Sequence, residues 1–327
     1  MGLEGKRVLV TGAGGFIGSH LSERLVEAGA VVRAFVHYNS AGTRGWLDES
    51  PLCDKMEVVA GDVTDRDSVG EAIEGVNIVF HLAALIGIPY SYHAPVSYLH
   101  TNAEGTLNVL QASLKAGVEK VLHTSTSEVY GTAQYVPIDE KHPLQGQSPY
   151  SATKIAADQL AEAFHRSYGL PVIIVRPFNT FGPRQSARAV IPTIIVQALS
   201  SDRIRLGHLA PTRDFNFINN TVEGFIRIAE SPNAIGEVVN IGSGREISIG
   251  ELAHCIMKIL NKQLVLEEDE RRIRPDGSEV DRLLADNTKI CILAEWMPRY
   301  SLEEGLQITV EWIAQHLERY RADVYTI

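Results

Sequence analysis

The chain has 327 residues, of which 45% are hydrophobic, so it is long enough to bury a large core and to form two lobes. Its formal net charge of −10 argues against a general nucleic-acid-binding protein, because binding to a phosphate backbone depends on Lys and Arg. The three cysteines are far apart and lack the paired spacing of a metal site, so we expect reduced thiols and no bound metal in a cytoplasmic protein. We expect neither a signal peptide nor a membrane span, because no apolar run approaches the roughly 20 residues that a span requires.

The N-terminal segment predicts a strand, a glycine turn and a helix that together bind a dinucleotide. Residues 7–11 have a buried-strand pattern, three glycines spaced Gly-x-x-Gly-x-x-Gly follow, and a helical pattern then runs to Gly29. Glycines let the backbone approach a pyrophosphate, and the helix N-terminus favours its negative charge. The residues expected to contact the cofactor here are Gly12, Gly15, Phe16, Ile17 and Gly18.

Three further strands are predicted at residues 31–36, 57–63 and 77–82. An acidic residue at the end of the second strand would select NAD, but Asn39 and its neighbours are not acidic. Arg33 and Arg44 are near enough in sequence to meet a 2′-phosphate, so we expect NAD while NADP stays open. Asp62 is interpreted either as a contact to the adenine edge or as the N-cap of the next helix. The cofactor contacts expected from these strand ends are Asn39, Asp62, Val63, Leu82, Ala83 and Ala84.

The rest of the chain continues the alternation of strands and helices. Residues 89–95 are expected to form a loop over the site, 95–116 a long helix, and 120–124 and 171–176 the fifth and sixth strands. This alternation predicts the α/β class, with a Rossmann-type doubly wound parallel sheet. We expect residues 1–178 to form the dinucleotide-binding domain, with segments of about 213–240 joining it. Residues 179–327 are expected to form a smaller C-terminal α/β substrate lobe.

Tyr150 and Lys154 are expected to share one face of a helix, because they are four residues apart. Ser148 and Pro149 read as an N-cap and a first helical residue, which places Tyr150 in the first turn. An ammonium group near a phenol favours the phenolate, so this pair predicts a base with a lowered pKa.

Over essentially its whole length, the chain resembles the extended short-chain dehydrogenases/reductases. The motifs that carry the resemblance are Thr11-Gly12-x-x-Gly15-x-x-Gly18, Gly61-Asp62-Val63, His81-Leu82-Ala83-Ala84, Tyr150-x-x-x-Lys154 and Arg176-Pro177-Phe178-Asn179. Within this family, Glu128 after Thr126-Ser127 resembles the sugar-nucleotide 4,6-dehydratases, whereas epimerases usually carry a small residue there. Strings at residues 36–40, 45–48, 88–92, 182–188 and 274–280 resemble the dehydratases of legionaminic-type sugar pathways, which act on nucleotide-linked N-acetylglucosamine.

The resemblance implies an NAD-dependent lyase that removes water from a nucleotide sugar. Tyr150 would take the proton of the sugar 4-hydroxyl, and Thr126 would bind the same oxygen. Lys154 would lower the Tyr150 pKa and hold the ribose hydroxyls, so Tyr150 and Lys154 are also expected to contact the cofactor. Glu128 would remove the C5 proton, and either Glu128 or Ser127 would supply a proton to the C6 hydroxyl as it leaves. The substrate contacts that the resemblance implies are Pro89, Tyr90, Thr126, Asn179, Arg184, Arg213, Arg274 and Glu279.

Three alternatives stay open. A UDP-glucuronate decarboxylase requires a cation near the sugar carboxylate, which residues 86–92 do not supply, although His93 lies just beyond them. A 4- or 5-epimerase leaves Glu128 less explained. The intact Tyr150, Lys154 and Glu128 count against a dinucleotide-sensing regulatory protein. The nucleotide, UDP or GDP, cannot be read from the sequence. The resemblance also implies a homodimer, with Ala156, Leu160 and Phe164 either at its seam or in the internal core.

Overall fold

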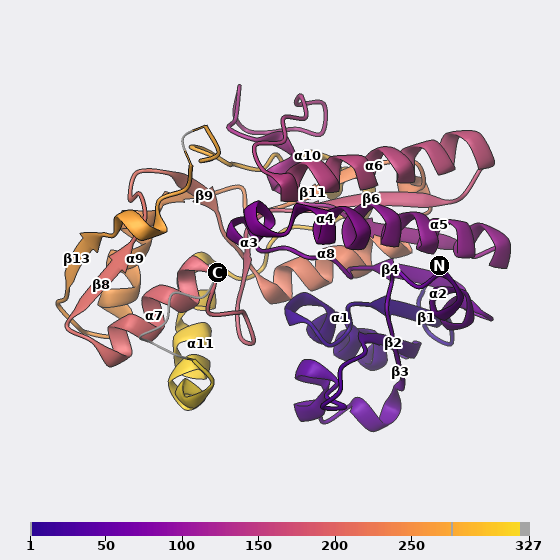
Figure 1. Ribbon diagram of the computed structural model, residues 1–327, viewed down its shortest axis with the longest axis horizontal. Coiled ribbons are helices and arrows are strands. Elements are labelled where there is room, and N and C mark those ends of the chain that lie inside the picture. The colour runs from indigo at the N-terminus through magenta and orange to yellow at the C-terminus, as the bar shows by residue number, and fades with distance from the viewer. Residues whose placement is uncertain (1, 276, 321–327) are drawn as a thin grey trace.

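The computed structural model describes residues 2–275 and 277–320, which fold around a seven-stranded parallel sheet (Figure 1). The strands stand in the order β11-β6-β5-β4-β1-β2-β3. Their bounds are β1 Arg7–Thr11, β2 Val31–His37, β3 Glu57–Gly61, β4 Ile78–His81, β5 Lys120–Thr124, β6 Val172–Pro177 and β11 Val238–Ile241. The chain order reverses between β1 and β4, which makes the sheet doubly wound and confirms the predicted fold class.

Helices cover both faces of this sheet (Figure 1). Helices α2 (Arg66–Ile73), α5 (Gly105–Ala116) and α6 (Pro149–Tyr168) pack on one face. Helices α1 (Phe16–Glu27), α8 (Ile218–Glu230) and α10 (Thr288–Ala294) pack on the other. Both faces are therefore apolar, and the six predicted strands of residues 1–178 are present with ends shifted by at most two residues.

A smaller lobe stands beyond the carboxyl ends of the strands (Figure 1). It contains three short strand pairs, β8 (Arg203–Leu206) with β13 (Val265–Glu268), β9 (Thr212–Asp214) with β12 (Glu246–Ser248), and β7 (Thr180–Phe181) with β10 (Asn216–Phe217). Its helices are α7 (Val190–Ser200), α9 (Ile249–Ile259) and α11 (Leu302–Gln315). The chain returns from this lobe to the main sheet, because β11 pairs with β6 and α8 lies against α1.

The predicted loop at residues 89–95 is wrong, because Ile88–His93 forms helix α3. Pro89 lies in its first turn, where the missing N–H costs nothing, and the Ser91 hydroxyl donates to the Ile88 carbonyl at 2.7 Å. The predicted long helix at 95–116 is divided into α4 (Pro95–Tyr98), a π-helical segment (Leu99–Glu104) and α5. Apolar spacing alone does not reveal such a π segment.

Three further features bear on the expectations from sequence. Phe164 packs in the core between α6 and the sheet, which is the internal alternative for this residue. No helix in the described part of the chain combines the length and the apolar character that crossing a bilayer requires. Within the same residues, no three His, Cys, Asp or Glu side chains are grouped as metal ligands.

Helix α10 offers a matched test of the packing that carries the chain back to the main sheet. Ile290 is fully buried, whereas Ile292 on the same helix is 74% exposed. We expect Ile290→Ala to lower the free energy of unfolding by about 2–5 kcal/mol, because it leaves a cavity under α10. Ile292→Ala is expected to change it by less than about 0.5 kcal/mol. Urea denaturation of both variants measures this, and equal losses would contradict the packing described.

Candidate active site

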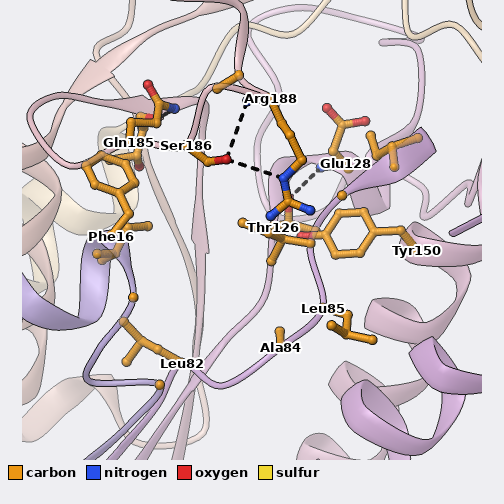
Figure 2. A pocket seen from close by; sticks show the side chains of 18 of the residues that line it. Phe16, Leu82, Ala84, Leu85, Thr126, Glu128, Tyr150, Gln185, Ser186 and Arg188 are labelled. Atoms are coloured by element: carbon orange, nitrogen blue, oxygen red, sulfur yellow. Dashed lines mark hydrogen bonds between the residues drawn. The ribbon is translucent and has the colours of Figure 1, made fainter. Parts of the chain in front are cut away.

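A cavity of about 1080 Å³ lies at the carboxyl ends of β1, β4, β5 and β6, between the sheet and the smaller lobe. Sites for single small ligands usually enclose roughly 300–1,000 Å³, so this one has room for more than one bound molecule. The glycine turn and the ends of β2, β3 and β4 line one half. The segment after β5, the start of α6 and the smaller lobe line the other (Figure 2).

The glycine turn is built for close approach. Gly12 has φ +72°, and a Cβ there would lie 2.9 Å from the Ala83 nitrogen. A Cβ on Gly18 would lie 2.1 Å from the Gly12 carbonyl oxygen. Gly15 is the N-cap of α1 and offers no side chain to its first N–H groups, which therefore remain available to an anion.

The same half of the cavity is also lined by Asn39, Asp62 and Val63, three of the residues expected to contact the cofactor. Asp62 accepts hydrogen bonds from the Thr64 N–H and hydroxyl, both at 2.8 Å, whereas Asp65 is the residue that caps α2. Arg33 does not line this cavity, because its guanidinium donates to Glu57 and to two backbone carbonyls. Arg44 lines it and donates to the Cys53 sulfur at 3.3 Å.

These residues fit NAD. Side chains at Gly12 and Gly18 would collide with neighbouring backbone, so the glycines allow a ligand to lie directly against the backbone. The first N–H groups of α1, which no side chain caps, suit a diphosphate. Leu82, Ala83 and Ala84 continue the lining toward the centre of the cavity with small or apolar side chains. The Thr124 hydroxyl is buried without a hydrogen-bond partner among the described residues, and Thr124 lines the cavity there.

Five polar side chains meet at the end of β5. Thr126, Ser127 and Glu128 follow the strand in a short 3-10 turn, Ser127–Tyr130, and Tyr150 and Lys154 face them from α6. All five are buried and line the same cavity. The Thr126 hydroxyl accepts from the Glu128 N–H at 3.2 Å and also hydrogen-bonds to the Tyr150 phenol. Ser148 caps α6 and Pro149 follows it, as predicted.

Burial governs the charges of this cluster. It raises the pKa of Tyr150, and the hydrogen bond to Thr126 opposes the rise. The Tyr150 pKa therefore lies above that of a free phenol and not below it, as the pairing with Lys154 had predicted, because withdrawal of the phenol from water dominates. Burial also lowers the pKa of Lys154 to about 8, against the opposing charge of Asp158. The Lys154 ammonium donates to the Thr124 carbonyl at 2.7 Å.

A cationic cluster lines the opposite side. Arg213 donates to Glu279 at 3.0 Å, and the Arg274 guanidinium lies 3.5 Å from the same carboxylate oxygen. The side-chain amide oxygen of Asn179 is buried without a hydrogen-bond partner in the described residues. Such an atom is costly to leave unpaired, so it is suited to a polar ligand.

Two residues expected at the substrate are not brought to the cavity. Arg184 does not line it, because its guanidinium forms a two-pronged ion pair with Glu23 of α1, at 2.9 and 3.0 Å. Tyr90 also lies outside the lining, 41% exposed, with its ring 6.2 Å from that of Tyr98. Pro89 lines the cavity as expected.

Arg188 was not expected in the site. Figure 2 shows its side chain reaching from the loop after β7 toward Thr126 and Tyr150. Its only hydrogen-bond partner within residues 2–275 and 277–320 is Ser186, at 3.3 Å from Nε, and it forms no ion pair there. Arg184 and Arg188 occur in one sequence string, and nothing in that string shows which of them turns toward α1.

The comparisons with known proteins agree with this geometry. Residues 9–309 match the family model described as GDP-mannose 4,6 dehydratase. The UDP-N-acetyl-alpha-D-glucosaminuronate decarboxylase of Bacillus cytotoxicus is 33% identical, over 95% of this chain and 98% of that protein. The UDP-glucose 4-epimerase of Mycolicibacterium smegmatis is 34% identical, over 94% and 98%. DesIV, a dTDP-glucose 4,6-dehydratase from Streptomyces venezuelae solved with NAD bound, has a TM-score of 0.87 and 30% identity, over 96% and 98%.

The glycine turn yields a direct test of cofactor binding. We expect Gly18→Ala to weaken NAD binding at least about tenfold, because the new Cβ collides with the Gly12 carbonyl and shifts the turn. Gly70→Ala in α2 is the matched control, since nothing lies within 4 Å of its Cβ position. Calorimetric titration with NAD compares the two variants. Unchanged affinity in Gly18→Ala would contradict the assignment of this turn to the cofactor.

Proposed function

Because the chain belongs to the family described as GDP-mannose 4,6 dehydratase, a group of extended short-chain dehydrogenases/reductases that modify nucleotide sugars with NAD, we propose that it is a 4,6-dehydratase. The proposed substrate is a UDP- or GDP-linked N-acetylglucosamine, and the product is its 4-keto-6-deoxy derivative. The observation that carries the proposal is a buried carboxylate, Glu128, in the same cavity as Tyr150 and Thr126.

Tyr150 and Thr126 bind the sugar 4-hydroxyl in this proposal. NAD, when bound, supplies the hydride acceptor for C4 and later the hydride donor for C6. Because burial raises the Tyr150 pKa, the phenol gives up its proton to solvent only with help from neighbouring positive charge. The phenolate then accepts the proton of the sugar 4-hydroxyl as the hydride leaves C4, while the Thr126 hydroxyl holds that oxygen in place. The Lys154 ammonium stabilises the negative charge that develops on the phenol.

Glu128 carries the elimination. A carbonyl at C4 acidifies the C5 hydrogen, and the Glu128 carboxylate accepts that proton. The same carboxyl group then returns the proton to the C6 hydroxyl, which leaves as water, so the elimination is balanced with one acid–base residue. Ser127, buried beside it, is the alternative relay for this proton. A 4-epimerase needs no such group, so Glu128 favours the dehydratase over a 4-epimerase.

The cationic cluster is proposed to bind the diphosphate. Arg213 and Arg274 are held together by Glu279, and their remaining N–H groups suit phosphate oxygens. Asn179 contributes an amide from the segment between β6 and β7. The division of the chain follows the same geometry: residues 1–178, with parts of 213–240, hold the cofactor, and the remainder of 179–327 holds the nucleotide sugar.

Arg188 favours a second candidate, decarboxylation of a nucleotide-linked hexuronate. This alternative lacked a cation for the sugar carboxylate, and Arg188 is a cation that lines the cavity on the side of Tyr150. In such a reaction the C4 carbonyl promotes loss of carbon dioxide, and Glu128 has no proton to remove from C5.

A homodimer is also proposed, through α6 and the α4–α5 segment. Val96 and Leu99 are 63% and 52% exposed on the α4–α5 segment, and Leu160 is half-buried on α6. Ala156 is likewise half-buried, so a partner can cover both α6 side chains, whereas Phe164 is already in the core.

Two substitutions separate the proposed steps. Tyr150→Phe is expected to lower kcat by about 10²–10⁴-fold while NAD binding is nearly unchanged, because the proton transfer at C4 is lost. Glu128→Gln is expected to permit oxidation at C4 and to block elimination, so reduced cofactor accumulates. Near-ultraviolet absorbance after one turnover distinguishes them: only Glu128→Gln should show the reduced nicotinamide. Full activity in Glu128→Gln would exclude the dehydratase mechanism.

The reaction itself is tested by product mass. Incubation with UDP-N-acetylglucosamine and, separately, with GDP-N-acetylglucosamine is expected to give loss of one water from one of them, which also identifies the nucleotide. Unchanged mass with a changed NMR spectrum would indicate an epimerase. Loss of carbon dioxide from UDP-glucuronate, with no reaction of either N-acetylglucosamine nucleotide, would replace the dehydratase by the second candidate.

A further inference from the structure

Asp158 is a buried carboxylate behind the candidate active site, and it does not line the cavity. It follows Tyr150 and Lys154 at intervals of four residues, so the three lie along one face of α6. Its side chain is 1% exposed. A charged group buried this completely must be compensated by its neighbours.

Four donors surround this carboxylate. One oxygen accepts from the Ser125 hydroxyl at 2.8 Å and from two Arg176 nitrogens at 2.9 and 3.1 Å. The other oxygen lies 3.2 Å from His123 Nε2. His123 lies in β5, Ser125 follows that strand directly, and Arg176 lies in β6. Asp158 therefore joins α6 to the strand end that leads into Thr126 and Glu128.

The groups around Lys154 leave Asp158 as its stabilising charge. His81 of β4 and His123 of β5 are neutral, because burial lowers the pKa of each imidazole. From β6, Arg176 is positive and also donates to the Tyr130 hydroxyl at 3.0 Å. On α6 itself, Tyr150 is a neutral phenol. The negative charge of Asp158 is the contribution that opposes the loss of the Lys154 proton.

We propose that Asp158 is a positioning residue that keeps Lys154 in its ammonium form and fixes the end of β5 beneath Thr126 and Glu128. The proposal rests on the function proposed above, since it is there that the ammonium assists Tyr150. A purely structural ion pair with Arg176 would hold the strand end equally well but would leave the charge of Lys154 unaffected.

The decisive variant is Asp158→Asn in the full chain saturated with NAD, because it removes the charge and nearly keeps the shape. The measurement is the pH titration of the Lys154 side chain by carbon NMR, with Lys154→Arg to assign the resonance. We expect the pKa of Lys154 to fall by about one to three units in Asp158→Asn. An identical Lys154 titration in the variant and the unsubstituted protein would overturn the proposal.

Matched variants separate charge from packing. Ser125→Ala removes one hydrogen bond but leaves the carboxylate, so the Lys154 titration is expected to stay in place. Asp158→Glu restores the charge and is expected to recover most of the shift. If Asp158→Asn does not fold with Arg176 unpaired, Asp158→Asn combined with Arg176→Gln is compared with Arg176→Gln alone, and the Lys154 pKa is expected to be lower in the double variant. A shift in Ser125→Ala as large as in Asp158→Asn would count against the proposal.

Activity supplies a second readout. The alkaline limb of the kcat/KM profile is expected to move to lower pH in Asp158→Asn, because Lys154 loses its proton earlier as the pH rises. A uniform loss of activity with an unmoved limb would indicate a structural role alone. The NMR titration requires no sugar nucleotide, so a wrong assignment of the substrate would leave that test intact.

Discussion

The parallel pairing of β1, β4, β5 and β6 brings the carboxyl ends of four strands to one edge of the sheet. Every part of the candidate site depends on this edge: the glycine turn leaves β1, Leu82 to Ala84 follow β4, and Thr126 to Glu128 follow β5. Because the chain order reverses between β1 and β4, the helices after them diverge to opposite faces and leave a crevice. The smaller lobe covers that crevice and supplies Arg213 and Arg274 from above the strand ends.

Burial gives this edge its chemistry and also its main energetic cost. The same withdrawal from water that keeps the Tyr150 phenol neutral also weakens the hold of Lys154 on its proton. Burial disfavours the charged forms of both Tyr150 and Lys154, so each requires an opposite charge nearby when it is ionised. Asp158 lies behind Lys154, and in front of Tyr150 the cavity is open to the substrate, whose reaction would generate the charges that these groups are placed to meet.

Arg184 and Arg188 both lie in the loop after β7, but they make different interactions. Arg184 has φ +71°, a conformation that side chains rarely adopt, and its ion pair with Glu23 ties the loop to α1. His20 of the same helix contacts the Pro183 carbonyl at 3.1 Å. The Tyr320 hydroxyl donates to the carbonyl of Gln185, the residue after Arg184, and so anchors the loop there as well. With its first residues anchored, the loop turns Arg188 back toward the cavity, where its charge bears on the choice between a neutral and an anionic sugar.

The sequence by itself determined the α/β class, the six strands of residues 1–178, the glycine turn and the Tyr150–Lys154 pair. These features depend on local periodicity, on turn residues and on spacing along one helix, all of which are written in short segments. Only the tertiary structure decided that residues 88–93 are helical, that Arg184 belongs to α1 and Arg188 to the cavity, and that Tyr150 is less acidic than a free phenol. The reason is physical: burial and ion pairing depend on residues brought together from distant segments, as Glu23 meets Arg184 and Asp158 meets Arg176. The spacing of residues within one segment does not specify contacts between distant segments.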